Sequence, residues 1–88
     1  MFNNSNIDSS VLLRVKNALG ITGNFQDNTI EEYIKEVLSF VKSAGVKEHN
    51  ITIGLITRGV ADLWNYGSND GKLSTYFIQR ITQLALLE

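Results

Sequence analysis

The sequence predicts an all-α fold, a small bundle of about four helices with short connections. Apolar residues recur three, four and seven positions apart in four successive segments, which is the spacing that puts side chains on one face of a helix. The 88 residues include no proline, and a glycine follows each of the first three segments where a helix would end. We expect helices at about residues 10–19, 27–44, 51–66 and 74–87.

The first expected helix, residues 10–19, has polar side chains at its start and a glycine after its end. Asp8, Ser9 or Ser10 can cap the N-terminus with a side-chain oxygen. Gly20 can adopt the left-handed conformation that ends many helices. The apolar face consists of Val11, Leu12, Val15 and Leu19.

The second expected helix, residues 27–44, keeps its apolar spacing over four turns. Asp27 near its start and Lys42 near its end complement the helix dipole. Glu31 and Lys35 are spaced for an i,i+4 ion pair. The apolar face consists of Ile30, Tyr33, Ile34, Val37, Leu38, Val41 and Ala44.

The third expected helix, residues 51–66, has a stripe of apolar residues and two candidate caps, Asn50 and Thr52. Ile51 and Ile53 also suit a strand, but the alternation stops after Ile53, which favours a helix. The stripe consists of Ile53, Ile56, Val60, Leu63 and Trp64.

Two glycines, Gly54 and Gly59, lie inside this third helix, where each costs about 1 kcal/mol relative to alanine. Close packing between helices of the same chain is the first explanation. A close approach by a neighbouring subunit is the alternative.

The fourth expected helix follows Ser74, a good N-cap residue. Its apolar residues are Phe77, Ile78, Ile81, Leu84, Ala85 and Leu87. Residues 1–8 are polar and rich in asparagine, and we expect them to form a flexible tail on a single helical domain, residues 9–88.

The size of the chain limits its stability. With 88 residues, 43% of them hydrophobic, it can form one core, and a domain of this size buries only about 60% of the surface that its unfolded chain exposes. Small domains often add disulfides, a metal or association. The sequence has no cysteine and one histidine, His49, so we expect no disulfide, no metal and no cofactor. Association with copies of itself or with a larger assembly is therefore the remaining way for this chain to gain stability.

The sequence offers no combination of residues typical of an enzyme. His49 lies beside Glu48 in a polar segment and is interpreted as an exposed loop residue. Glu31 and Glu32 are adjacent, so their side chains diverge by about 100° on a helix and cannot face one substrate atom. We therefore expect a protein without catalytic activity.

The charges are nearly balanced, with 8 Lys and Arg against 9 Asp and Glu and a net charge of −1. Proteins that bind nucleic acid tightly usually carry a basic face, and this chain has no basic run. No segment reaches the roughly 18 apolar residues that span a membrane. The N-terminal residues do not resemble a secretory signal, so we expect a cytosolic origin and no membrane contact.

Four charged or aromatic residues are candidates for a subunit contact. Arg58 and Asp62 lie one helical turn apart and could pair within the helix or with a second chain. Tyr66, near the end of the same helix, is expected to face outward, as interface aromatics often do. The full set is Arg58, Asp62, Tyr66 and Arg80.

Three segments of the chain follow the pattern of one protein family. They are Val11–Ile21, Ile56–Gly67 (ITRGVADLWNYG) and Leu73–Leu84. In the order and spacing of these segments the chain resembles the small head–tail connector, or adaptor, proteins of tailed phages and prophages, which are also catalogued as phage DNA-packaging proteins.

The resemblance implies an all-helical structural subunit that assembles with copies of itself into a ring of twelve beneath the portal protein. The next neck or tail component would bind the ring, and DNA would pass through its channel without tight binding. The protein would occupy the virion neck, and the host cytoplasm during assembly.

Two other functions are compatible with the residues. A small helical DNA-binding or regulatory protein would need a turn of three or four residues and a basic recognition helix. The connection between the second and third helices is longer than that, and the third helix offers only Arg58. A phage accessory protein that forms no ring is the other alternative.

Overall fold

The computed structural model describes residues 9–64 and 73–87, and these form an all-α fold. The α-helices in this part of the chain are α1 (Ser9–Leu19), α2 (Asp27–Ser43), α3 (Ile53–Trp64) and α4 (Thr75–Ala85), with a short 3₁₀ turn, η1 (Glu48–Asn50). The predicted class is therefore confirmed. The tail expected at residues 1–8 lies outside the described residues.

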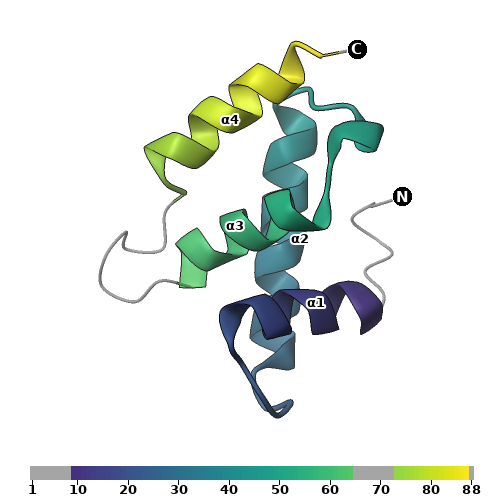
Figure 1. Ribbon diagram of the computed structural model, residues 1–88, viewed down its shortest axis with the longest axis vertical. Coiled ribbons are helices and arrows are strands. Elements are labelled where there is room, and N and C mark those ends of the chain that lie inside the picture. The colour runs from purple at the N-terminus through teal and green to yellow at the C-terminus, as the bar shows by residue number, and fades with distance from the viewer. Residues whose placement is uncertain (1–8, 65–72, 88) are drawn as a thin grey trace.

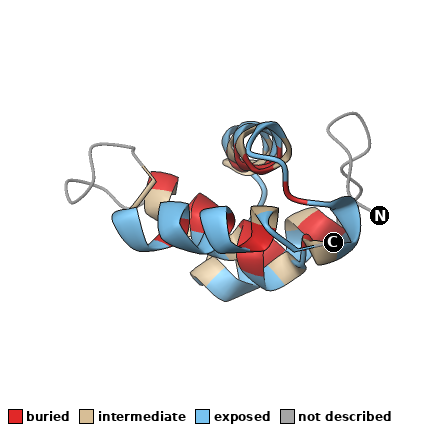
Figure 2. Ribbon diagram, turned by 90° about the horizontal axis from the view of Figure 1, so that it is seen from above, coloured by how far each residue is buried: buried red, intermediate tan, exposed pale blue. Residues whose placement is uncertain are grey.

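The helices are arranged in two layers. Helix α2 runs along the long dimension of the molecule, and α1, α3 and α4 all lie on one side of it (Figures 1 and 2). Helix α3 crosses the middle of α2, with α1 toward one end of α2 and α4 toward the other (Figure 1). The layering makes the molecule thin, with principal extents of 38 × 29 × 17 Å.

The core fills the space between these layers. Helix α2 contributes most to it, because its apolar face is buried along its whole length. The fully or nearly fully buried side chains include Val15, Ile30, Ile34, Val37, Leu38, Val41, Ile56, Val60, Phe77 and Ile81. The aromatic ring of Phe77 on α4 lies 6.4 Å from that of Phe40 on α2, so α4 joins the core largely through long side chains.

Gly59 lies where α3 packs tightly against α2 and α4. A Cβ atom added to it would lie 2.8 Å from Cγ1 of Val37 and 2.9 Å from Cζ of Phe77. Packing within the chain, the first explanation for this glycine, is therefore confirmed. Gly54 differs, because its position is exposed and a Cβ there would meet only Thr52, at 3.9 Å.

The start of α3 lies two residues later than predicted. Thr52 caps it, since the backbone N–H of Leu55 donates to Oγ1 of Thr52 at 3.1 Å. Ile51 before the cap has extended backbone and is buried. Val46, placed by the sequence in a polar connection, is buried as well. Residues 65 and 66, the predicted end of this helix, lie outside the described residues.

The helix ends otherwise follow the chemistry of the sequence. Gly20 and Gly45 have φ angles of 73° and 98°, the left-handed conformation expected after α1 and α2. Lys16 on α1 forms an ion pair with Asp27 at the start of α2, at 2.7 Å. This pair closes the connection between the first two helices.

Two expectations for α2 and α4 were wrong in detail. Lys35 lies 3.8 Å from Glu32 and forms its ion pair there instead of with Glu31. Helix α4 ends at Ala85, so Leu87 lies beyond it and is half exposed. Within the described ranges, no helix is long and apolar enough to cross a bilayer.

Candidate functional site

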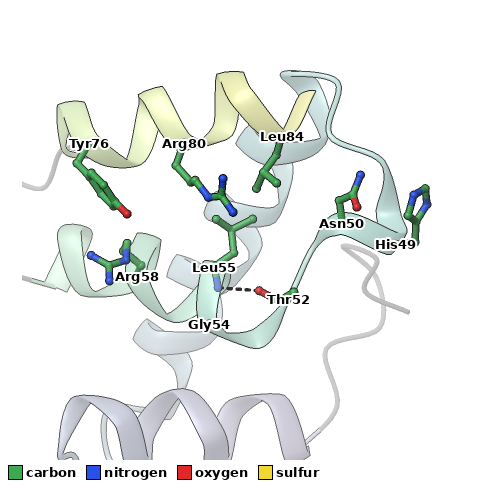
Figure 3. A pocket seen from close by; sticks show the side chains of 9 residues that line it. All are labelled: His49, Asn50, Thr52, Gly54, Leu55, Arg58, Tyr76, Arg80 and Leu84. Atoms are coloured by element: carbon green, nitrogen blue, oxygen red, sulfur yellow. Dashed lines mark hydrogen bonds between the residues drawn. The ribbon is translucent and has the colours of Figure 1, made fainter. Parts of the chain in front are cut away.

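A groove runs between α3 and α4 on the side of the molecule away from α2. It encloses about 450 Å³, and we call it the arginine groove. Figure 3 shows Tyr76, Arg80 and Leu84 reaching into it from α4, and Leu55 and Arg58 from α3. The remaining lining residues are His49, Asn50, Thr52 and Gly54.

Two arginines give the groove its charge. The guanidinium of Arg58 lies 5.1 Å from the centre of the Tyr76 ring, within the range of a cation–π interaction. Nη1 of Arg80 donates to Oε1 of Gln83, one turn along the same helix, at 3.3 Å. Both arginines and Tyr76 are exposed. Their donors are therefore accessible from solvent.

The groove contains no residue that would neutralise this charge. None of its lining side chains is acidic. The ion pairs found in the described part of the chain are Lys16–Asp27, Lys35–Glu32 and Lys42–Glu48, and none of them involves Arg58 or Arg80. Two guanidinium groups that share a groove repel each other and favour an anionic partner.

The floor of the groove is partly apolar and partly polar. Leu55 and Leu84 are buried and close the bottom. Thr52 caps the first turn of α3 beside Gly54, so the positive end of the α3 dipole also faces this region. Nδ2 of Asn50 is buried there without a hydrogen-bond acceptor among the described residues.

The predicted contact residues have three different locations. Arg58 and Arg80 are exposed and lie in the same groove, although they are 22 positions apart in the sequence. Asp62 is partly buried and accepts hydrogen bonds from the backbone N–H and Oγ of Ser74, at 3.0 and 2.8 Å. Tyr66 lies outside the described residues.

Of the two alternatives for Arg58 and Asp62, the intrahelical ion pair is not found among the described residues, and the bridge to a second chain remains a prediction. The carboxylate of Asp62 holds Ser74, whose Oγ in turn accepts from the backbone N–H of Phe77 at 3.1 Å. This leaves Arg58 free to stack on Tyr76. Asp62 is only partly exposed, because its carboxylate is bound by Ser74 at the start of α4.

Sequence reasoning missed Tyr76. The spacing could have indicated it, because Tyr76 and Arg80 are four residues apart and are therefore neighbours on the surface of α4. That face is separate from the buried one formed by Phe77, Ile81 and Leu84. An exposed aromatic residue one turn from an arginine is typical of a protein contact surface.

A second, shallower hollow lies between α1 and α3. It encloses about 490 Å³ and shares Gly54 and Arg58 with the arginine groove. Its walls are mainly small or apolar, and they include Ala18, Leu19, Ile53 and Ala61. Its charged lining residues are Arg14, Arg58 and Asp62, so this hollow carries both signs of charge.

The described residues include no cluster of metal-binding side chains. No group of three or more His, Asp or Glu residues in residues 9–64 and 73–87 could hold a metal ion. His49 is exposed at one end of the groove. The arrangement is suited to holding an anionic group through hydrogen bonds and charge.

No protein-family model matches the chain, and comparisons with curated proteins and with solved structures also give no match.

Proposed function

We propose that the protein is a structural subunit of a tailed-phage or prophage head–tail connector, which works by assembling into a ring beneath the portal protein. The observation that carries the proposal is the arginine groove, because it combines an exposed tyrosine with two exposed arginines that form no ion pair in the described part of the chain. Arginine and tyrosine are enriched where proteins bind one another. The resemblance of the sequence to connector proteins supports the same function.

The charge distribution is also compatible with a channel for DNA. The chain has a net charge of −1, and its described basic residues are divided between the surface and ion pairs with carboxylates. Affinity for DNA rises steeply with each phosphate that a protein neutralises. A connector must let the duplex move, so weak binding is the property that its function requires.

Co-sedimentation with the portal protein of the same phage or prophage tests this proposal. We expect the chain to sediment with portal rings and to remain in the supernatant without them, unless it has formed rings of its own. Failure to bind the portal at any concentration, together with failure to self-assemble, would contradict the connector function.

A salt-titrated DNA-binding measurement separates this proposal from the DNA-binding alternative. We expect weak binding, in keeping with the small number of free basic side chains. Sub-micromolar binding whose logarithm falls steeply with the logarithm of salt concentration would overturn the connector proposal in favour of a DNA-binding protein.

A further inference from the structure

We propose that the arginine groove binds the outer face of α2 from a second copy of this chain. The inference rests on the proposed function, in which the protein works as a ring, and it names the two surfaces that meet. The acidic surface of the pair is formed by Glu32 and Glu36 on α2, and we call it the glutamate ridge.

The glutamate ridge lies on the side of α2 opposite its buried face. Ile34 and Val37 face the core, whereas Glu32 and Glu36 are both exposed. They are four residues apart and therefore neighbours on the helix surface, where like charges destabilise a helix. Lys35 offsets this only in part, because its contact with Glu32 is 3.8 Å long and exposed.

The chemistry of the two surfaces is complementary. The ridge presents two carboxylates one helical turn apart, and the groove presents two guanidinium groups with no acidic lining residue. Arginine binds carboxylates through paired N–H···O hydrogen bonds, which are stronger than those between neutral groups. The hydroxyl and ring of Tyr76 lie beside Arg58 and can pack against the aliphatic part of the incoming glutamates.

The positions of the two surfaces favour a ring over a dimer. Figure 1 looks down the shortest axis of the molecule with α3 and α4 in front of α2, and Figure 3 shows the groove on this front side. The ridge is on the outer side of α2, so the two surfaces lie at opposite ends of the 17 Å dimension. A contact between different surfaces is heterologous and repeats from copy to copy, closing into a ring when the rotation allows it. Nearly opposite surfaces require a small rotation per copy, which is about 30° in a ring of twelve.

The area available is adequate for such a contact. The monomer exposes 5473 Å², and a stable interface buries about 800 Å² per partner. Each copy in a ring makes two contacts, so roughly a third of its surface would be covered. That gain in burial suits a domain too small to bury most of its own surface.

The ridge also argues against a nucleic acid as the occupant of the groove. Phosphates would be attracted by two arginines but repelled by a chain of net charge −1. A second copy supplies the required carboxylates at the spacing of one helical turn. We therefore assign the groove to α2 of a neighbouring subunit.

Charge exchange between the two surfaces tests the inference. The full chain is made in wild-type form, as a groove variant (R58E,R80E) and as a ridge variant (E32K,E36K), and self-association is measured by sedimentation velocity at low salt. We expect each variant to associate at least about tenfold more weakly than wild type, because like charges then face each other. An equimolar mixture of the two variants should recover association, because every contact in an alternating assembly is again between opposite charges.

Two further variants complete the design. The fourfold variant (R58E,R80E,E32K,E36K) has the wild-type net charge and should assemble with itself but not with wild type. The matched control K42E,K47E lies outside the groove lining and the glutamate ridge, changes the net charge as much as the groove variant does, and should associate like wild type. Circular dichroism and thermal unfolding establish that each variant is folded.

The result that would overturn the inference is association of either double variant at wild-type strength, or a mixture that does not recover it. A wild-type chain that stays monomeric up to about 1 mM, the range of millimolar affinities, would also overturn it. Co-sedimentation with the portal still decides the connector function in each case, so the two failures are distinguishable. DNA binding that is lost in the groove variant and kept in the ridge variant would assign the groove to nucleic acid instead.

Discussion

At the scale of single residues, two glycines in one helix have different roles. Gly59 lies at the crossing of α3 with α2 and α4, where the Val37 and Phe77 side chains leave no room for a methyl group. Gly54 lies in the first turn of α3 and is exposed, and a Cβ there would make only an ordinary van der Waals contact with Thr52. Packing requires the first glycine. The second lines both the arginine groove and the hollow between α1 and α3.

Replacing these glycines separates the two roles. We expect Gly59→Ala to destabilise the fold by about 1–3 kcal/mol, because the new Cβ overlaps two fully buried side chains and outweighs the better helix propensity of alanine. We expect Gly54→Ala to leave stability unchanged or to raise it by up to about 1 kcal/mol. Urea unfolding of both variants checks this, and equal stability of the two would contradict the packing described for Gly59.

At the scale of helices, a polar contact positions α4. Asp62 on α3 accepts two hydrogen bonds from Ser74, and Ser74 caps α4 through Phe77. The residues between α3 and α4 connect these helices, but this contact sets where α4 begins on the surface of α3. The helix that this contact holds carries Tyr76 and Arg80 of the arginine groove.

A double-mutant cycle measures this contact. We expect Asp62→Ala to cost about 1.5–3 kcal/mol, as hydrogen bonds to a charged acceptor do, and Ser74→Ala to cost about 1 kcal/mol through the lost cap. The double variant should be less destabilised than the sum, with a coupling of about 0.5–3 kcal/mol. Strict additivity in urea unfolding would mean that the two side chains do not act together.

The helices also show what sequence patterns can and cannot predict. The α-helices were predicted because their apolar spacing is regular and glycines follow their ends. The burial of Val46 and Ile51 was not predicted, because isolated apolar residues in or beside a polar segment show no periodicity. Arg58 and Arg80 were named from the sequence as candidate contact residues, but their meeting in one groove depends on how α4 packs beside α3. The partner of Asp62 depends on the same tertiary arrangement.

At the scale of the whole molecule, opposite charges lie on opposite sides of a thin domain. The glutamate ridge is on one side and the arginine groove on the other. The near-zero net charge is therefore the sum of an acidic surface and a basic surface. A domain of 88 residues with such surfaces can gain stability from its neighbours.

This coupling of stability to assembly should appear in thermal unfolding. We expect the unfolding midpoint of the wild-type chain to rise with protein concentration, because binding to the native state stabilises it by mass action. Each 1 kcal/mol gained at the midpoint corresponds to about 4–8 °C for a domain of this size. Scanning calorimetry of the wild type and of R58E,R80E at two concentrations checks this. A midpoint that rises equally in both proteins would show that the groove takes no part.

Negative-stain electron microscopy of the chain mixed with its portal protein tests the central claim most directly, that this protein acts as a ring-forming connector. We expect closed rings of the chain stacked on one end of the portal. Portal rings that stay bare at every concentration of added chain, with no rings of the chain alone, would contradict the claim.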